Sequence, residues 1–242
     1  MSETALQETA AKPPVSELPD PLHRNLHWRT FQLIMQNVFC FWLGYRSRGL
    51  ENIPQSGGGL MVINHQSFLD PLLVGLPLTR PVSFLARDSL FRVPFIGWVL
   101  RHTYVMPINR EAASTASLRE AIRRLQHGFL VGIFPEGTRT TDGAVGALKP
   151  GFLALMRRSR LPVYPVGISG AFEAMPRNSV MLWPRRVRVV YGPPISTELI
   201  ESFGRDEDGL LALVRDRLIA CQAEAEDWRL GRTSTPHATA GQ

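Results

Sequence analysis

The most reactive pattern in the sequence is VINHQSFLDP at residues 62–71, in which Asp70 follows His65 by five positions. In one continuous helix these two side chains would lie about 140° apart and could not meet. A turn between them would fold the Asp70 carboxylate onto one imidazole nitrogen and leave the other nitrogen free to accept a proton. His65 and Asp70 are therefore candidates for a base and its orienting partner. The alternative is an ordinary turn, in which Asp70 caps the helix that Pro71 begins and His65 bonds to a loop carbonyl.

A second pattern, FPEGTR at residues 134–139, has the composition of an anion-binding loop. Gly137 permits a backbone turn closed to other residues, Thr138 and the local amide groups can donate hydrogen bonds, and Arg139 can grip two phosphate oxygens. Glu136 would repel a phosphate unless it is paired with an arginine or accepts a substrate hydroxyl. A strand-exit loop with a surface Glu/Arg pair explains the hexapeptide equally well.

Motifs of several other reaction classes are absent from the sequence. There is no G-x-S-x-G elbow, and neither Cys40 nor Cys221 has a histidine nearby in sequence, so no covalent nucleophile is indicated. The lack of phosphate-binding and dinucleotide fingerprints and of paired Cys/His ligands argues against nucleotide hydrolysis, dinucleotide redox chemistry and a metal site. A base without its own nucleophile indicates direct activation of a substrate hydroxyl.

The elements that must position these residues alternate along the chain. The clearest helix candidate is 113–128, which Gly128 ends, and a last amphipathic helix is expected within 197–228. Strands that alternate with helices predict an α/β fold: a single domain with a mixed, mostly parallel sheet covered by helices. The predicted strands are 60–64, 82–86, 104–108, 130–134, 163–168 and 187–191.

Polar clusters follow three of these strands directly. His65 comes after the first strand, Arg110 after the third and Glu136 after the fourth. Ligands of open α/β sheets bind beyond the carboxyl ends of the strands. If these strands are neighbours, the three clusters share one rim, with Arg110 as a second phosphate ligand. Lys149 precedes a further helix candidate, where an ordinary helix entry is the simplest interpretation.

Residues 26–43 mix aromatic and aliphatic side chains between flanking arginines. The pattern suits a helix that lies in a membrane interface or, about equally well, a core helix packed on the sheet. No run reaches the roughly 18 apolar residues of a spanning helix. The first residues carry acids and prolines where a signal peptide has a basic start and an apolar core, so we expect a mobile arm there.

The charge balance and the cysteines set broader limits. The chain has 27 basic and 21 acidic residues, a net charge of +6, and 44% hydrophobic content. Such a surface favours an anionic partner, although single arginines are as well explained as solvated side chains. The 2 cysteines do not imply a disulfide framework, and a reducing compartment fits them.

The motifs together resemble the 1-acyl-sn-glycerol-3-phosphate acyltransferases of the glycerolipid acyltransferase superfamily. NHQSFLD resembles the first block of that family, VMPINR the second, FPEGTR the third and LPVYPVGI the fourth. The resemblance spans about residues 48–194. The second block departs from many relatives, which have an aspartate before the arginine that corresponds to Arg110.

The resemblance implies a reaction and a role for each residue. His65 would remove the proton from a glycerol hydroxyl, which attacks the thioester of an acyl-CoA or acyl carrier protein, and Asp70 would orient His65. The acceptor phosphate would be held by the remaining candidates, which are Arg110, Glu136, Gly137, Thr138 and Arg139. No cofactor is implied beyond the acyl donor, which is a co-substrate.

The composition of the two ends and the resemblance of the middle together imply an organisation of the chain. We expect a disordered arm at 1–24, an amphipathic membrane-interface helix at 25–45, an acyltransferase domain at 46–230 and a disordered tail at 231–242. The expected partners are a membrane lipid, the membrane surface and an acyl carrier protein. The expected location is the cytoplasmic face of the cell membrane, with peripheral or monotopic attachment.

Three hypotheses follow. The first is acylation of lysophosphatidic acid to phosphatidic acid, and its nearest alternative is the same chemistry on a lyso-ornithine lipid, a lysophospholipid or glycerol 3-phosphate. The second is a lipid-binding protein without catalysis. The third, a nucleic-acid binder, rests on charge alone and has no basic-aromatic module to support it.

Overall fold

The computed structural model describes residues 18–23, 26–87, 92, 97, 105–108, 115–177, 179 and 181–232. Arg110, most of the predicted arm and residues 233–242 of the predicted tail lie outside this part of the chain. The strands in the described ranges are β1 (Arg46–Arg48), β2 (Gly59–Ile63), β3 (Val82–Arg87), β4 (Met106–Ile108), β5 (Leu130–Ile133), β6 (Val163–Ser169) and β7 (Arg188–Tyr191).

These strands form one sheet in the order β1-β7-β6-β2-β5-β3-β4. Every neighbouring pair is parallel except β6 and β7, which run antiparallel. The predicted mixed, mostly parallel sheet is therefore confirmed, and all six predicted strands are present. The seventh strand, β1, was not predicted, because its sequence Arg-Ser-Arg has no apolar alternation.

The helices are α1 (Leu26–Trp42), α2 (Asp70–Gly75), α4 (Thr115–His127), α5 (Leu153–Ser159), α6 (Ala171–Ala174), α7 (Thr197–Ser202) and α8 (Glu207–Leu230). Helix α4 ends at Gly128, whose φ of 104° is closed to most other residues, as predicted. The last predicted helix, within 197–228, is present as α8, which ends two residues beyond that range, and a separate short helix, α7, precedes it. Gly204 takes a left-handed φ of 48° between them, and the Asp206 carboxylate caps α8 by accepting the Gly209 N–H at 2.8 Å.

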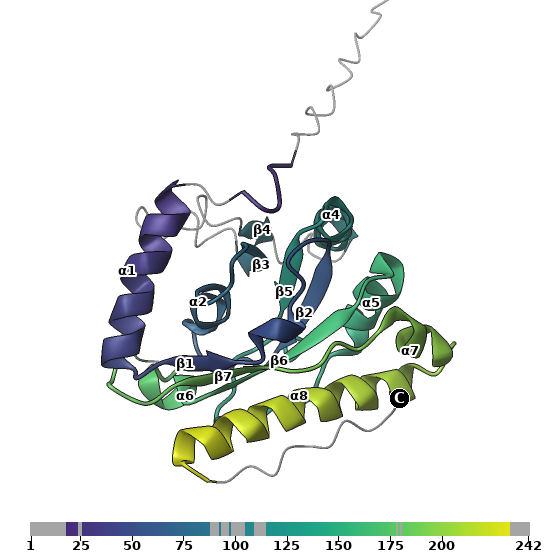
Figure 1. Ribbon diagram of the computed structural model, residues 1–242. Coiled ribbons are helices and arrows are strands. Elements are labelled where there is room, and N and C mark those ends of the chain that lie inside the picture. The colour runs from purple at the N-terminus through teal and green to yellow at the C-terminus, as the bar shows by residue number, and fades with distance from the viewer. Residues whose placement is uncertain are drawn as a thin grey trace, which may run out of the picture.

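Helices cover both faces of the sheet (Figure 1). Alternate residues of β2 point to opposite sides, so Leu60 and Val62 pack with α4, α5, α7 and α8. Met61 and Ile63 pack on the other side, with the end of α1 and with α2. Since β2 is buried along its whole length, its carboxyl end leaves the sheet from the middle of the molecule.

Helix α1 lies outside α2 and is held to it by polar contacts. The Gln32 amide donates to the carbonyls of Leu76 and Leu78, at 2.6 and 2.9 Å. One side of α1 is thus buried, while its outer side exposes large apolar side chains: Leu26, Leu33, Ile34, Val38, Phe41 and Trp42. The helix therefore has features of both sequence interpretations, a packed helix and an apolar surface. No helix in the described ranges combines the length and apolarity that crossing a bilayer requires.

Candidate active site

The site begins where β2 ends, one residue beyond Ile63. The side chain of Asn64 donates to the carbonyl of Ile168 at 3.0 Å and accepts its N–H at 2.7 Å. This pair of bonds continues the β2–β6 ladder through a side chain. The next residue, His65, therefore starts from a fixed position at the carboxyl edge of the sheet.

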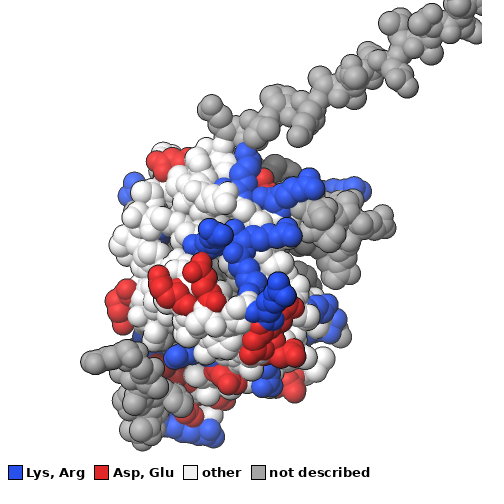
Figure 2. Space-filling view, turned by 90° about the vertical axis from the view of Figure 1, so that its right-hand side faces the viewer, with Lys and Arg blue, Asp and Glu red and all other residues white. Residues whose placement is uncertain are grey.

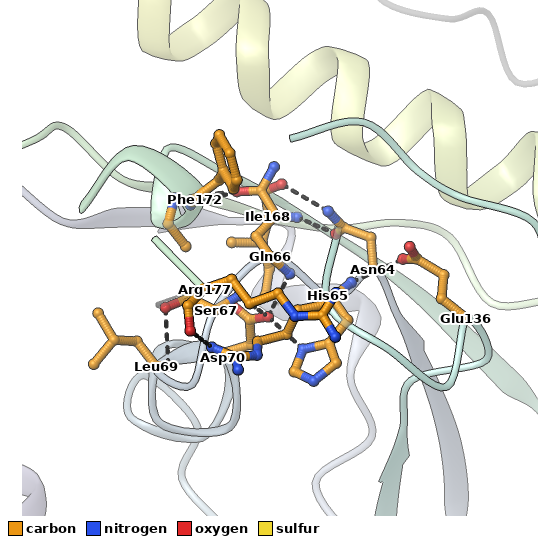
Figure 3. A network of polar contacts seen from close by, with 12 residues as sticks. Asn64, His65, Gln66, Ser67, Leu69, Asp70, Glu136, Ile168, Phe172 and Arg177 are labelled. Atoms are coloured by element: carbon orange, nitrogen blue, oxygen red, sulfur yellow. Dashed lines mark hydrogen bonds and ion pairs between the residues drawn. The ribbon is translucent and has the colours of Figure 1, made fainter. Parts of the chain in front are cut away.

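His65 and Asp70 meet, as the turn hypothesis requires (Figure 3). The His65 Nδ1 lies 2.8 Å from the Asp70 Oδ2. With the carboxylate ionised, Nδ1 carries the hydrogen and Nε2 is left as the acceptor. Nε2 has no hydrogen bond to another described residue, and the His65 side chain keeps 21% of its surface exposed. This nitrogen can take a proton from a molecule that reaches the edge.

The expectation that the Asp70 side chain caps α2 was wrong, because its carboxylate bonds to amide groups that precede the helix. The Asp70 Oδ2 accepts the N–H groups of Gln66 and Ser67, at 2.7 and 2.8 Å, which precede α2 rather than belong to its first turn. The same oxygen thus gathers three donors, including the imidazole of His65. The carboxyl group folds backward because the turn through residues 66–69 presents these amide groups toward it.

Asp70 is fully buried, and its Oδ1 has no hydrogen-bond partner in the described part of the chain. Burial raises the pKa of Asp70, and the hydrogen bond and charge of His65 and the two backbone N–H groups act in the opposite direction. A carboxylate in this position is poorly solvated. It therefore stabilises a positive charge on the neighbouring imidazole more strongly than a surface carboxylate would.

The loop after β5 holds His65 from the other side. The Glu136 Oε1 accepts the His65 N–H at 2.9 Å, and the Thr140 N–H donates to the His65 carbonyl at 2.8 Å. The Phe134 ring stacks on the imidazole, with 4.1 Å between centroids and 22° between planes. Both backbone groups and one face of the ring are thus fixed by residues 134–140, which leaves the base little freedom to turn.

Glu136 is buried within the protein, with 5% of its surface exposed. Its second oxygen, Oε2, accepts the Gly146 N–H at 3.0 Å. Burial raises the pKa of Glu136, and the backbone donors of His65 and Gly146 lower it. Both oxygens are therefore engaged in joining two loops. The expected contact of Glu136 with the acceptor stays a prediction. The observed bonds show that the side chain also holds the backbone of His65 in place.

The other loop residues face outward. Gly137 has a left-handed φ of 67°, and a Cβ added there would lie 2.8 Å from the Lys149 Nζ. Thr138 is exposed beside it. The Arg139 guanidinium lies 4.1 Å from the centroid of the Phe68 ring and donates from Nη1 to the carbonyl of Arg177 at 3.0 Å. The loop thus combines a glycine turn with two nearby cations, Arg139 within it and Lys149 beside Gly137.

The topology confirms the shared rim for two of the three predicted clusters. His65 and Glu136 are brought together because β2 and β5 are neighbouring parallel strands. The third cluster, with Arg110, lies outside the described residues. It follows β4, which β3 separates from β5 and which ends at the same edge.

An apolar cavity of about 260 Å³ opens beside the loop, between α4 and α5. Its floor includes Ile133 and Phe134, its walls include Leu118 and Leu155, and Lys149 lies among the residues that line it. An apolar chain could lie along it and end near the imidazole. No cluster of three or more histidine, cysteine or acidic side chains suited to a metal ion occurs in the described ranges.

Several supporting residues were missed from the sequence. Asn64 and Phe134 lie within the two motifs, and each was given no task beyond ending a strand. Lys149 was taken as an ordinary helix entry, yet its side chain contacts Gly137. A signal was available for Lys149, since it is one of two lysines in a chain whose other basic residues are all arginine.

Comparison with known proteins identifies related sequences. The family model described as Acyltransferase matches residues 44–169 of the 242. A chloroplastic 1-acyl-sn-glycerol-3-phosphate acyltransferase of Arabidopsis thaliana is 32% identical over 180 residues, which are 73% of this chain and 50% of that protein. An enzyme of the same name from Borreliella burgdorferi is 28% identical over 71% of this chain and 68% of its own length. The match thus spans only half of the Arabidopsis protein.

A solved structure has the same fold. The crystal structure of the 1-acyl-sn-glycerophosphate acyltransferase PlsC from Thermotoga maritima superposes with a TM-score of 0.70 at 27% sequence identity. The similarity covers 86% of this chain and 81% of that one. The predicted α/β architecture and the predicted family are both confirmed by these comparisons.

Proposed function

The chain belongs to the acyltransferase family that includes the 1-acyl-sn-glycerol-3-phosphate acyltransferases, and from this premise we propose that it makes phosphatidic acid from lysophosphatidic acid. A fatty acyl group moves from a thioester donor to the free hydroxyl of the acceptor. The observation that carries the proposal is the 2.8 Å bond between the His65 Nδ1 and the buried Asp70 carboxylate, which leaves Nε2 open at the sheet edge.

The chemical steps follow from this arrangement. The Nε2 of His65 removes the hydroxyl proton as the acceptor oxygen attacks the thioester carbonyl carbon, and Asp70 stabilises the imidazolium that forms. The tetrahedral intermediate then collapses, its carbon–sulfur bond breaks, and the imidazolium returns its proton to the leaving thiolate. The donor is acyl-CoA or an acyl carrier protein, and no other cofactor takes part in these steps.

The loop of Gly137, Thr138 and Arg139 would receive the phosphate of the acceptor. Its support is the combination of exposed loop residues with two cations, Arg139 above Phe68 and Lys149 against Gly137. Arg110 is proposed as a further phosphate ligand from the loop after β4. The apolar cavity between α4 and α5 suits the acyl chain, because its lining residues are mainly aliphatic and aromatic.

The acceptor also suggests a location. A lysolipid resides in a bilayer, and α1 presents an apolar outer side while its inner side packs on the fold. We place the protein peripherally or monotopically on the cytoplasmic face of the cell membrane, with α1 in the interface.

An acyl-transfer assay with full-length protein, acyl-CoA and lysophosphatidic acid tests the function. Wild type should form phosphatidic acid, and His65→Ala should lower the rate by about 10³-fold or more while lipid binding is retained. Lyso-ornithine lipid, a lysophospholipid and glycerol 3-phosphate are assayed in parallel. Turnover of one of these without turnover of lysophosphatidic acid would reject the proposed acceptor but keep the chemistry. An unchanged rate in His65→Ala would reject the chemistry.

A further inference from the structure

Five large apolar side chains, none of them given a catalytic task above, are exposed and belong to three separate segments. They are Phe41 at 87%, Trp42 at 51%, Phe68 at 54%, Met181 at 59% and Trp183 at 49% exposure. We call this set the apolar edge. Single exposed apolar residues are common, whereas a group of large ones on one border of a protein marks an interaction surface.

The sheet topology places these segments at the catalytic edge. Because β7 is antiparallel to β6, its first residue, Arg188, pairs with the last residue of β6, Ser169. Because β1 is parallel to β7, its first residue, Arg46, also starts there. The segment that precedes β7 and the end of α1 that precedes β1 therefore lie where β2, β5 and β6 finish. Figure 1 shows the lower end of α1 beside β1 and α6.

Hydrogen bonds connect the segments to one another. The Trp42 Nε1 donates to the carbonyl of Leu182 at 3.0 Å, and the Trp183 N–H donates to the carbonyl of Ala174 at 2.8 Å. The Ser67 hydroxyl donates to the carbonyl of Met175 at 3.1 Å. A continuous path thus runs from α1, through residues 181–183 and the end of α6, to the turn that contains His65.

The same border is positively charged. The Arg139 guanidinium covers the Phe68 ring, and Arg177, Arg185 and Arg186 are exposed. Among the ion pairs identified in the described ranges, none involves Arg177, Arg185 or Arg186. Tryptophan beside arginine is the composition of a surface that enters the headgroup region of an anionic bilayer.

The opposite face has a different character. Figure 2 views the molecule from the side away from α1, and charged side chains of both signs are distributed over that face. On the α1 side, the apolar edge meets the apolar outer side of α1, where Leu33, Ile34 and Val38 are exposed. The two surfaces are continuous through Phe41 and Trp42.

We propose that the apolar edge is a second membrane-contact surface, which inserts into the interface of an anionic bilayer together with α1 and sets the catalytic edge against the lipid. The inference rests on the proposed function, because a membrane-resident acceptor gives this orientation its purpose. With Phe68 three residues from His65 in the chain, a lysolipid can reach the imidazole from the headgroup region without crossing bulk water.

Vesicle binding by the full chain tests the surface. The variant Met181→Gln/Trp183→Gln removes apolar area from residues that make no contact with His65, and Leu199→Gln removes an exposed apolar side chain of α7, 38% exposed, as a matched control. On vesicles of phosphatidylcholine with phosphatidylglycerol, the double variant should bind about tenfold or more weakly, and the control should bind as wild type does. Equal binding of wild type and the double variant overturns the proposal, and this result is expected if a protein partner covers the edge. No binding by wild type also overturns it.

The charge component has its own variant. Arg185→Gln/Arg186→Gln should weaken binding by roughly fivefold per arginine on vesicles that contain phosphatidylglycerol, and hardly at all on pure phosphatidylcholine. The loss should diminish as salt is raised. An equal loss on both kinds of vesicle would contradict an electrostatic role for these two residues.

Acyl transfer separates this inference from the function on which it rests. The Met181→Gln/Trp183→Gln variant should lose turnover of lysophosphatidic acid in vesicles but keep turnover of a short-chain acceptor dissolved as monomers. Loss of both activities to the same degree in a folded variant overturns the membrane role. If wild type acylates no acceptor, the proposed function fails, and the vesicle-binding result still decides the surface.

Discussion

Replacing Asp70 by asparagine tests the central pair of the site with a minimal change of shape. The amide oxygen can take the place of Oδ2 and accept from His65, Gln66 and Ser67, because the amide nitrogen then occupies the position of Oδ1, which has no partner in the described part of the chain. The variant therefore keeps the hydrogen bonds of the turn but removes the negative charge beside the imidazole.

The negative charge of Asp70 should stabilise the imidazolium of His65 by several kcal/mol once His65 has accepted the proton. At the 2.8 Å separation of the His65 Nδ1 and the Asp70 Oδ2, Coulomb's law with an effective dielectric constant of about 20 gives about 6 kcal/mol between imidazolium and carboxylate. This attraction exists only after His65 has taken the substrate proton. We therefore expect kcat to fall by about 10³ to 10⁴-fold, with little change in KM, as in the Ser-His-Asp triad.

Stability and its pH dependence provide the control. A buried amide without an acceptor costs about 1–3 kcal/mol, so the variant should remain folded by circular dichroism and unfold at a somewhat lower urea concentration near neutral pH. Burial raises the pKa of Asp70 in the folded state above its unfolded value. The stabilisation from its bound proton is therefore present below pH about 4 and is lost as the pH rises through the raised pKa. The advantage of wild type over Asp70→Asn should shrink over that range.

A folded Asp70→Asn protein that keeps more than about a tenth of the wild-type kcat would contradict an electrostatic role for Asp70. A loss confined to KM would also contradict it, since the charge is expected to act in the transition state and not in acceptor binding.

Three further changes test the loops and helix that surround the site. Gly137→Ala should lower the free energy of unfolding in urea by about 1–2 kcal/mol and lower kcat/KM, because the residue has a φ of 67° and little room for a Cβ. Gly151→Ala is the control and should be close to neutral, since an added Cβ there meets no atom within 4 Å. Because burial raises the pKa of Glu136, the stability of wild type relative to Glu136→Gln should fall as pH rises from about 4 to 7, and a flat difference in a titration of unfolding free energies would contradict this. Gln32→Ala should cost about 1–2 kcal/mol in the same assay, since the Leu78 carbonyl loses its side-chain donor while the Leu76 carbonyl keeps the bond from Gln36. Gln36→Ala should cost less, because the Leu76 carbonyl keeps the bond from Gln32.

The parts of the fold that sequence predicted are those with strong local patterns. All six predicted strands are apolar runs in the sequence, and β2, β6 and β7 are buried along their whole length. Gly128 and Gly137 occupy the left-handed conformations expected of them. The meeting of His65 and Glu136 followed from one topological rule, that parallel strands end at one edge. These features needed no knowledge of long-range contacts beyond the order of strands.

The features that were missed have different causes. Strand β1 exists because Arg46 and its neighbours pair with β7, more than a hundred residues away, and nothing in Arg-Ser-Arg indicates a strand. The Asp70 carboxylate turned toward Gln66 and Ser67 because the tertiary position of His65 favours that direction over a helix cap. The separation of α7 from α8 had a local signal in Gly204 and Asp206, which the apolar periodicity on either side obscured.

The bonds from the 134–140 loop to the backbone of His65 have a geometric consequence for any acceptor. His65 donates its N–H to Glu136 and accepts from Thr140, so the base and the turn of residues 137–139 belong to one rigid piece of backbone. In the proposed function, a phosphate on that turn and a hydroxyl at Nε2 would be held at a nearly constant distance from each other. The protein would then select acceptors by the number of covalent bonds between the phosphate and the hydroxyl. An acceptor with one bond fewer or more would be a poor substrate even if its charge were identical.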